Sequence, residues 1–342
     1  MTGAGAPGAA GILKCLKQEK NWRVLMADAN PDSPGRFLQS GFENIPPATA
    51  PLFIDHLLAL CSREEIDILL PLVTKELIPL ASSLGKFEKQ GTRVIVSPLA
   101  SLEIANDKGK LYLFLEWRDI PIPAFRIVEN IDQFKDAIAA LGFPTNPVCF
   151  KPTVSNGSRG FRVIRDDINE LSLLFDQKPN HTYIRSDDAM RILSSGAFPE
   201  LLVSEYLPGN EYSVDCLVMH GETLVALPRL RKKMINGISV EGSFEEDKEI
   251  IDYCKKINAS LKLHGNIGIQ VKRSIKGRPL LVEINPRVQG AISACLGTGI
   301  NLPALAIMQE MQVPITESNL AINWNTGFSR YWEEVFYQVH AS

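Results

Sequence analysis

Apolar and polar positions follow two different patterns along the chain, and the first pattern covers residues 1–100. Short apolar runs, which predict buried strands, lie at residues 24–27, 68–70 and 94–96. Stretches in which apolar residues recur at helical spacing lie near residues 9–20, 51–62 and 75–84. Strands that alternate with helices in this way predict βαβ units and a mainly parallel sheet.

The second pattern begins after Pro98. A helix near residues 107–118 leads into the Ile-Pro-Ile-Pro segment at 120–123, a stiff, non-helical link that marks a boundary. Longer strands separated by turn signals follow at residues 148–151, 161–164, 201–206, 212–219 and 223–227. A long helix is predicted over residues 245–262. We therefore expect an α/β domain followed by an α+β region.

The composition is that of an ordinary globular protein. Hydrophobic residues make up 45% of the chain and charged residues 22%, which excludes a disordered protein. Lys and Arg number 36 against 39 Asp and Glu, for a formal net charge of −3. This balance argues against a nucleic-acid partner, because a phosphate backbone is bound by a basic face. The 342 residues suggest two or three domains.

The cysteines and the N-terminus indicate a cytoplasmic protein with no membrane partner. The six cysteines form no CxxC pair and no Cys/His cluster with zinc spacing, so we expect reduced, buried thiols. No basic segment followed by an apolar one begins the chain, so we expect no signal peptide. The most apolar window, residues 66–80, is interrupted by Lys75 and Glu76 and is too short to span a bilayer.

The most informative pattern is a predicted hairpin formed by residues 268–272 and 280–285. If Lys276-Gly277 is a two-residue loop, Gln270 lies opposite Glu283. The apolar residues, among them Val271 paired with Val282, then share one face of the hairpin.

The other face of this hairpin carries oxygen ligands. Gln270, Glu283 and Asn285 lie together there, and carboxylate and amide oxygens suit Mg²⁺ that is held jointly with phosphates. Arg287 follows after Pro286, where a guanidinium could bind a phosphate or carboxylate. The alternative is a solvated polar face of an antiparallel sheet.

These residues carry a resemblance to a known family. Glu283-Ile284-Asn285-Pro286-Arg287 resembles the E-x-N-P-R signature of the ATP-grasp superfamily, and the surrounding sequence is similar to the carbamoyl-phosphate synthase large chain. The resemblance implies that Gln270, Glu283 and Asn285 hold the Mg²⁺ of ATP, with Mn²⁺ as a possible substitute. It also implies that Arg287 is catalytic and stabilises the transferred phosphoryl group.

Other sequence motifs of the ATP-grasp superfamily occur upstream of this hairpin, in the order typical of the family. Residues 205–212 resemble the adenine hinge, so the backbone of Glu205, Tyr206 and Leu207 would contact adenine and Glu211 would bind ribose. The alternative is an ordinary strand, turn and strand with solvated glutamates.

The phosphate side of the site is expected upstream. The resemblance implies that Lys151 is catalytic, as Arg287 is. Lys151 precedes a small-residue loop in which Gly157 and Ser158 would contact phosphates. Lys108, at a predicted helix start, resembles the second phosphate-binding cation of the family. A surface hairpin and a common helix-start charge are the alternatives for these two features.

The resemblance implies a fold and a division of the chain. A Rossmann-like preATP-grasp domain over residues 1–100 would precede a two-lobed ATP-grasp fold, α/β and α+β in class. The small lobe would cover residues 101–199, and the large lobe with a C-terminal extension residues 200–342. Mg-ATP would bind between the two lobes.

The chemistry implied is that of an ATP-dependent carboxylate–amine (or ammonia) ligase. A small-molecule carboxylate would attack the γ-phosphate of ATP, and an amine would then displace phosphate from the acyl phosphate. Arg229 and Arg231 are candidates to bind the carboxylate substrate, with an exposed basic loop as the alternative. A homodimer is possible. Two other functions remain open: a partner-dependent carbamoyl-phosphate-synthase-like subunit, and a protein that binds nucleotide without turnover.

A competing hypothesis comes from the N-terminus. Gly3, Gly5 and Gly8 match G-x-G-x-x-G, and Asp28 ends a strand about 20 residues later, as in a dinucleotide fingerprint. Only two residues precede Gly3, so the strand that the fingerprint requires would be missing or very short. A glycine-rich turn is also a packing device. Thr74, at a predicted helix start, is either a helix cap or a contribution to the acceptor site.

Overall fold

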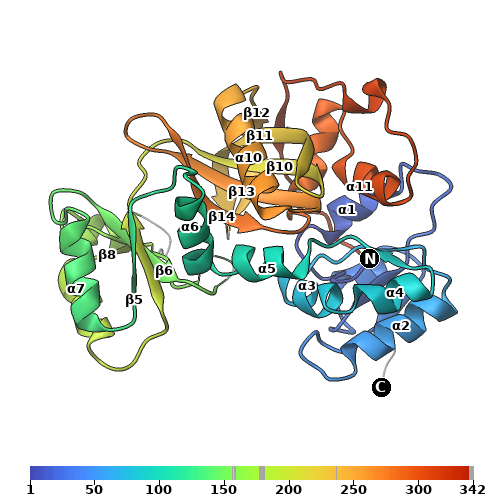
Figure 1. Ribbon diagram of the computed structural model, residues 1–342, viewed down its shortest axis with the longest axis horizontal. Coiled ribbons are helices and arrows are strands. Elements are labelled where there is room, and N and C mark those ends of the chain that lie inside the picture. Colours follow the sequence, from blue (N-terminus) through green and yellow to red (C-terminus); the bar gives the residue numbers. More distant parts are fainter. Residues whose placement is uncertain (156, 158, 177–181, 236, 339–342) are drawn as a thin grey trace. The chain divides into compact units, whose positions relative to one another are not determined.

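The computed structural model describes residues 1–155, 157, 159–176, 182–235 and 237–338, which form two compact units (Figure 1). Unit 1 contains residues 1–105, 210–271 and the chain from 282 onward, and unit 2 contains residues 106–209 and 272–281. The grouping differs from the predicted division, because the first 105 residues cluster with most of the predicted large lobe.

The first part of unit 1 has the parallel strands that the apolar runs predict. Strand β1 (Met26–Asp28) pairs with β2 (Phe42–Asn44), and β3 (Ile68–Leu69) pairs with β4 (Arg93–Val94), both in parallel. Thr2 forms parallel bridges to Ala27 and to Pro71. The strand expected before the glycine-rich turn is thus a single bridged residue that joins the two strand pairs.

Five helices accompany these strands: α1 (Ala9–Leu16), α2 (Phe53–Arg63), α3 (Thr74–Ala81), α4 (Leu84–Lys89) and α5 (Leu99–Ala105). The helical predictions are confirmed to within a few residues. Each helix forms because its apolar side chains recur on one face and are buried there, as Leu57 of α2 and Leu80 of α3 are.

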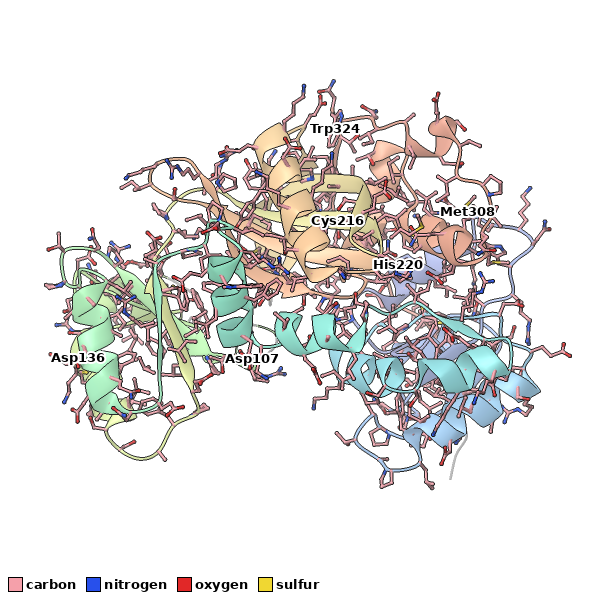
Figure 2. All side chains as sticks on the ribbon, in the orientation of Figure 1. Asp107, Asp136, Cys216, His220, Met308 and Trp324 are labelled. Atoms are coloured by element: carbon pink, nitrogen blue, oxygen red, sulfur yellow. The ribbon has the colours of Figure 1, made fainter. Side chains whose placement is uncertain are left out.

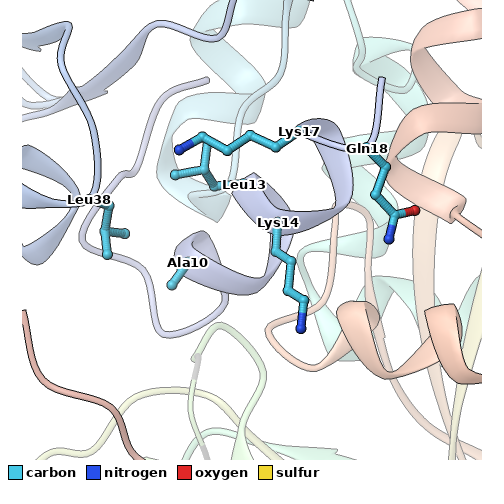
Figure 3. A pocket seen from close by; sticks show the side chains of 6 residues that line it. All are labelled: Ala10, Leu13, Lys14, Lys17, Gln18 and Leu38. Carbon is cyan, nitrogen blue, oxygen red and sulfur yellow. The ribbon is translucent and has the colours of Figure 1, made fainter. Parts of the chain in front are cut away.

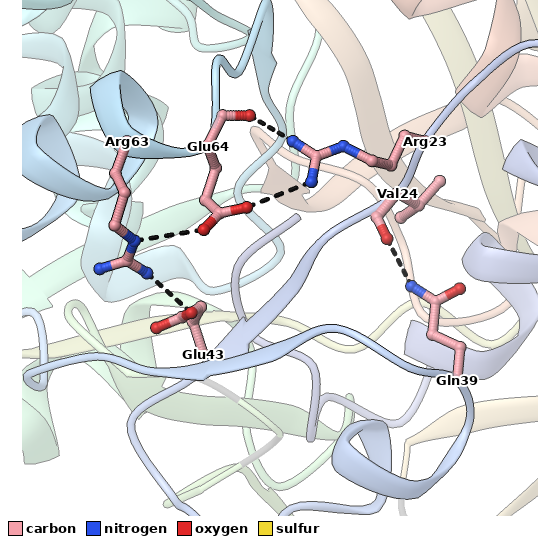
Figure 4. Close-up of polar contacts among 6 residues, drawn as sticks. All are labelled: Arg23, Val24, Gln39, Glu43, Arg63 and Glu64. Atoms are coloured by element: carbon pink, nitrogen blue, oxygen red, sulfur yellow. Dashed lines mark hydrogen bonds and ion pairs between the residues drawn. The ribbon is translucent and has the colours of Figure 1, made fainter.

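Polar contacts cross-link the surface of this region (Figure 4). Glu64, just after α2, accepts from Arg23 at 3.1 Å and from Arg63 at 3.2 Å, and Arg63 also lies 2.7 Å from Glu43. Gln39 Nε2 donates to the Val24 carbonyl at 2.6 Å. The side chains of Arg23 and Arg63 are 65% and 55% exposed, so the ion pairs contribute little to stability.

Unit 2 is built on a five-stranded sheet in the order β5-β9-β6-β7-β8. The strands are β5 (Phe125–Val128), β6 (Val148–Pro152), β7 (Arg162–Ile164), β8 (Tyr183–Ile184) and β9 (Leu201–Glu205). The pairs are antiparallel except for β7 and β8. The described residues of this unit include the helices α6 (Lys108–Trp117), α7 (Ile131–Ala140), α8 (Glu170–Phe175) and α9 (Ser186–Leu193).

The largest sheet has the strand order β14-β13-β10-β11-β12-β15. Its strands are β10 (Glu211–Met219), β11 (Glu222–Ile235), β12 (Ile238–Phe244), β13 (Gly265–Arg273), β14 (Pro279–Asn285) and β15 (Gly327–Ser329). Helix α10 (Lys248–Leu261) packs on this sheet, and a 3₁₀ helix (Ile292–Thr298) and α11 (Leu302–Glu310) follow β14. Strands β13 and β14 are neighbours, as the predicted hairpin requires, and the long helix is confirmed as α10.

One hydrophobic core joins the two ends of the chain in unit 1. Ile12 and Met26, from the first hundred residues, belong to the same buried cluster as Leu217, Ile292 and Leu305. The N-terminal region is therefore part of the core on which the large sheet rests.

No single helix in the described part of the chain is long and apolar enough to cross a membrane. Ile292–Thr298 and Leu302–Glu310 would pass by length and composition only as a pair, and that pair is bent by 98°. Several of its apolar residues, Ile292, Leu302 and Leu305 among them, lie in the buried core.

Candidate nucleotide and metal site

Strand β14 brings two of the predicted metal ligands together. Glu283 and Asn285 are half-buried and flank the buried Ile284, as the alternation predicts. Asn285 Nδ2 donates to Glu283 Oε1 at 3.2 Å, which leaves the Asn285 amide oxygen for another partner. A carboxylate and an amide oxygen side by side are a donor set that fits Mg²⁺.

The hairpin turn that leads into β14 differs from the prediction. Ser274 N donates to Arg278 O at 2.9 Å and Gly277 N donates to Ser274 O at 2.9 Å, so the loop has three residues rather than two. Gly277 has φ +78°, the left-handed conformation that closes such a loop. The predicted register is therefore wrong by one residue at the turn. Alternation also breaks nearby, because Leu280 and Leu281 are both buried while Val282 is half-buried.

The third predicted metal ligand, Gln270, has a different neighbour. Arg231 Nη1 donates to Gln270 Oε1 at 3.1 Å, and the same nitrogen donates to Glu211 Oε1. Among the described residues no hydrogen bond joins Gln270 to Glu283. Arg231 thus links the predicted ribose ligand to one of the predicted metal ligands, while its Nη2 donates to the Gly237 carbonyl at 2.6 Å.

Arg229 does not fit the substrate role that the sequence suggested. Its side chain is 1% exposed and its Nη2 donates to Asp215 Oδ2 at 3.0 Å, with Asp215 wholly buried. The guanidinium also lies 5.5 Å from the centre of the Phe328 ring. Arg229 is therefore a buried residue of β11 that pairs with Asp215 on the neighbouring strand β10.

Arg287 is held from two sides. Its Nε donates to Thr74 Oγ1 at 2.9 Å and its Nη1 donates to the Val288 carbonyl at 2.8 Å. Burial lowers the pKa of Arg287, and the Glu283 carboxylate opposes this shift. A guanidinium in this environment stays charged because its intrinsic pKa is so high, and it gains from an anionic partner.

The predicted phosphate-binding residues lie in unit 2. Lys108 and Lys151 are 7% and 8% exposed, so both cations are largely buried. Lys108 Nζ donates to the Ser155 carbonyl at 2.6 Å, which brings it to the small-residue loop. Gly157 has φ +67°, and among the described residues a Cβ built on it would meet Arg159 Nη1 at 3.7 Å. Ser158 lies outside the described residues.

Helix α6 places Lys108 at this loop. Asp107, seen at the start of the helix in Figure 2, accepts from the backbone of Gly109 at 2.9 Å and of Lys110 at 3.1 Å. This cap fixes the first turn of the helix. Lys108 N donates to the Thr153 carbonyl at 2.9 Å, so the same residue is tied to the loop by its backbone as well.

The predicted adenine hinge has a specific set of free backbone groups. Glu205 N donates to the Ala124 carbonyl at 3.0 Å and Tyr206 N donates to the Pro147 carbonyl at 3.2 Å. Within the described residues, Leu207 N–H has no acceptor. Ala124 N donates at 2.9 Å to the Glu205 carboxylate rather than to the Glu205 carbonyl. Among the described residues, the donor to that carbonyl is the Cys149 thiol, at 3.7 Å. The Leu207 N–H and the weakly bonded Glu205 carbonyl are thus available along this segment for a planar ligand.

The glycine-rich turn at residues 3–8 is packed against protein. A Cβ on Gly8 would lie 2.6 Å from Gly290 Cα, and one on Gly3 would lie 2.6 Å from Val73. Gly5 N–H donates to the Asp28 carboxylate at 2.6 Å. In a dinucleotide fingerprint such a loop amide faces the pyrophosphate. The contacts favour the packing interpretation of this turn.

Two contacts of the site could not be predicted from the sequence. Thr74 and Arg287 are 213 positions apart, and only the position of Thr74 after a strand marks it as a candidate. The link from Arg231 to Glu211 and Gln270 depends on three strands that the sequence does not order.

A cavity of about 340 Å³ lies against helix α1 (Figure 3). It is lined by Ala10, Leu13, Lys14, Lys17, Gln18 and Leu38. The two lysines and Gln18 are exposed, so it is an open surface depression. Among the described residues, no three His, Cys, Asp or Glu side chains form a group that could hold a metal. A metal bound at Glu283 would therefore rely on amide and ligand oxygens.

Two family models match the chain, one near its N-terminus and one in its C-terminal half. Residues 197–332 match the model described as "ATP-grasp in the biosynthetic pathway with Ter operon". Residues 2–95 match the model described as "PylC-like, N-terminal domain".

Among characterised relatives, the carbamoyl phosphate synthase large chain of Thermoplasma acidophilum is 24% identical over 291 residues. The match covers 79% of this chain and 26% of that protein. The chain therefore spans about a quarter of the length of this relative.

Solved structures share the fold. Carboxyaminoimidazole ribonucleotide synthase from Aspergillus clavatus, complexed with ATP, superposes with a TM-score of 0.69 at 13% identity, covering 94% of this chain and 78% of that one. The biotin carboxylase domain dimer of 2-oxoglutarate carboxylase from Hydrogenobacter thermophilus, in complex with MgADP, ADP and bicarbonate, superposes with a TM-score of 0.66 at 15% identity. It covers 94% of this chain and 71% of that one. The resemblance and the fold class inferred from the sequence are confirmed.

Proposed function

For a chain with the ATP-grasp fold behind a PylC-like N-terminal domain, we propose the function of an ATP-dependent, ADP-forming carboxylate–amine ligase. The substrates are a small-molecule carboxylate and an amine or ammonia. The observation that carries the proposal is the group on and just after β14: Glu283 bonded to Asn285, followed by an Arg287 held at two of its nitrogens.

The reaction has two steps. A carboxylate oxygen attacks the γ-phosphorus of ATP, and the bond from this phosphorus to the bridging β-phosphate oxygen breaks. The products of this step are ADP and an acyl phosphate. The amine nitrogen then attacks the acyl carbon, loses a proton and expels phosphate. Negative charge builds on phosphoryl oxygens, so fixed cations and oriented donors lower the barrier. No side-chain nucleophile is needed.

Residues of unit 1 serve the metal and the transferred group. Glu283 and Asn285, with Gln270 once Arg231 releases its oxygen, hold Mg²⁺; Mn²⁺ is a possible substitute. When bound, the ion neutralises phosphate charge. Arg287 stabilises the phosphoryl group, Glu211 binds the ribose hydroxyls, and Arg231 binds the carboxylate substrate.

Residues of unit 2 serve the rest of the nucleotide. Lys108 and Lys151 bind phosphates, with Gly157 leaving room for close approach of the backbone. The Glu205 carbonyl accepts from the adenine amino group and Leu207 N–H donates to the ring, while the chain at Tyr206 lies along the base. Support for these roles comes from the burial of the two lysines and from the backbone groups left over in the hinge.

The first test is nucleotide binding followed by turnover. We expect Mg-ATP to raise the melting temperature by mass action, with ATP plus chelator giving a smaller shift and NADH none. Mn²⁺ is tested in the same assay. Screening of carboxylates and amines should then reveal a pair on which ADP and phosphate release both depend. Stabilisation by NADH and not by Mg-ATP would contradict the proposal, and ATP binding with no turnover on any pair would favour a non-catalytic nucleotide-binding protein.

A further inference from the structure

We infer that Thr74 is a positioning residue for Arg287, an inference that rests on the proposed function and adds a residue of the N-terminal region to its machinery. Thr74 is the first residue of α3 and lies five positions after the last residue of β3. Arg287 follows β14 in the opposite part of the sequence, and the Nε to Oγ1 distance of 2.9 Å joins them.

The hydrogen bond selects one orientation of the guanidinium. Nε donates to Thr74 Oγ1 and Nη1 donates to the Val288 carbonyl, so two of the three nitrogens are fixed. Within the described residues, no acceptor contacts Nη2. Because the guanidinium is planar, fixing the first two nitrogens also fixes the direction of the third.

The two acceptors contribute differently to this orientation. The Val288 carbonyl belongs to the next residue in the chain, so it moves with Arg287. Thr74 belongs to helix α3, so its hydroxyl does not move with Arg287 and fixes the position of the guanidinium relative to another element. Arg287 is half-buried, and these two hydrogen bonds are the contacts that set its orientation among the described residues.

Thr74 is well placed for such a role by its own burial. It is half-buried, and its hydroxyl accepts from Arg287. No described residue accepts the hydroxyl proton of Thr74. The threonine is not the residue that caps α3, since the preceding Val73 holds that position without a side-chain bond. The hydroxyl therefore serves Arg287 rather than the helix.

The test compares two nucleotides that differ by the γ-phosphoryl group. Affinities for Mg-ADP and for the Mg²⁺ complex of a non-hydrolysable ATP analogue are measured by calorimetry on the full chain. In the wild type we expect the analogue to bind more tightly, because Arg287 contacts the extra phosphoryl group. In Thr74→Val the ratio of the two affinities should fall about ten-fold, the effect of losing one hydrogen bond to a charged group. Affinity for Mg-ADP should stay within about two-fold in the same variant.

Two further variants separate positioning from general damage. Thr74→Ser keeps the hydroxyl and should restore the ratio to within about two-fold of the wild type. Thr92→Val is the matched control, since the hydroxyl of Thr92 donates to the Ile66 carbonyl at 2.8 Å. Among the described residues, no hydrogen bond joins Thr92 to Arg287. It should leave the ratio unchanged.

The outcomes are distinguishable. An unchanged ratio in Thr74→Val, or an equal fall in Thr92→Val, would overturn the role of Thr74. A wild type that binds both nucleotides equally would also overturn it, because Arg287 would then not contact the γ-phosphoryl group. A wild type that binds neither nucleotide would instead refute the proposed function itself.

Discussion

Arg229 and Arg231 lie two positions apart on β11, and the structure gives them different environments. Arg229 is buried against Asp215, whereas Arg231 lies between Glu211 and Gln270. Asp215 Oδ1 and Arg229 Nη1 are both buried without a hydrogen-bond partner among the described residues. A buried pair that is only partly satisfied tolerates the loss of one member poorly.

The Asp215–Arg229 pair gives a stability prediction. Asp215→Asn should lower the free energy of unfolding by about 3 kcal/mol, because it leaves the buried Arg229 charge without a counter-ion. Denaturant unfolding followed by circular dichroism measures the change. The exposed pair of Asp188 and Arg191, 2.8 Å apart, supplies the control, and Asp188→Asn should change stability by less than about 0.5 kcal/mol. Equal effects of the two substitutions would show that burial does not determine how much the Asp215–Arg229 pair contributes to the free energy of unfolding.

Glu76 gives a prediction on pH. Burial raises the pKa of this carboxyl from 4.5 to about 7, although Thr2 Oγ1 donates to it at 2.6 Å. The folded state therefore binds a proton that the unfolded state has lost between pH 4.5 and about 7. Stability should fall as pH rises through this window, by about 3 kcal/mol for a shift of this size.

Glu76→Gln tests this pH dependence, because the amide cannot ionise but can still accept from Thr2. Free energies of unfolding at pH 5 and pH 8 should differ less in the variant than in the wild type, with the variant the more stable protein at pH 8. A wild type and a variant with parallel pH profiles would contradict the raised pKa.

Glu283 gives the prediction for the metal. Glu283→Gln should weaken the Mg²⁺-dependent part of ATP affinity by about ten-fold or more, because it removes the one carboxylate among the proposed ligands. The melting temperature without ligand should change little, since Glu283 is half-buried and lies outside the core. Glu222→Gln, an exposed position on the same sheet, is the control. Unchanged Mg²⁺ dependence in Glu283→Gln would refute the metal assignment.

At the scale of elements, helices and strands follow the sequence more closely than turns do. Helix α10 was predicted over residues 245–262 and runs from Lys248 to Leu261, because its apolar face has a clear period. The turn before β14 was predicted one residue too short, because Ile275-Lys276-Gly277 fits both a two-residue and a three-residue loop until hydrogen bonds are known.

Gly277 is the residue through which this turn can be tested. Gly277→Ala should lower the free energy of unfolding by about 1 kcal/mol, because φ is +78° and alanine is strained there. Gly85→Ala is the matched control: Gly85 lies inside α4, no atom comes within 4 Å of a Cβ built on it, and the substitution should stabilise the helix by up to about 1 kcal/mol. A neutral or stabilising Gly277→Ala would mean that the turn has another conformation.

At the scale of the whole molecule, the N-terminal region shares its core with the large sheet. Ala9, Ile12 and Leu13 of α1 lie in one buried cluster with Val225 and Ile292, and α1 contacts both the 3₁₀ helix and α11. The close approach of Gly8 to Gly290 belongs to the same interface. Removing the N-terminal region would therefore expose a large apolar surface.

A truncated chain tests this shared core. Residues 101–342 alone should lack a cooperative thermal transition and should bind a hydrophobic dye, whereas the full chain should unfold cooperatively without binding it. Near-ultraviolet circular dichroism and dye fluorescence measure the two properties. A truncated chain with native-like dichroism would show that the two parts fold independently.

Much of this protein was determined by patterns that are local in the sequence. Apolar periodicity predicted the parallel strands and helices of the first hundred residues, because burial of one face acts within each element. The ordered residues Glu283, Asn285 and Arg287 pointed to the ATP-grasp fold, because a metal–phosphate strand needs those side chains at that spacing. The placement of Glu283 beside Asn285 follows from the period of a strand.

Only the tertiary structure decided what surrounds each charge. The pattern of β11 is the same at Arg229 and Arg231, but one faces a covered core and the other faces Glu211 and Gln270. Thr74 meets Arg287 across 213 positions, a contact made by packing of the N-terminal region against the end of β14. Burial and long-range hydrogen bonds depend on which elements cover one another, and no local period in the sequence records that.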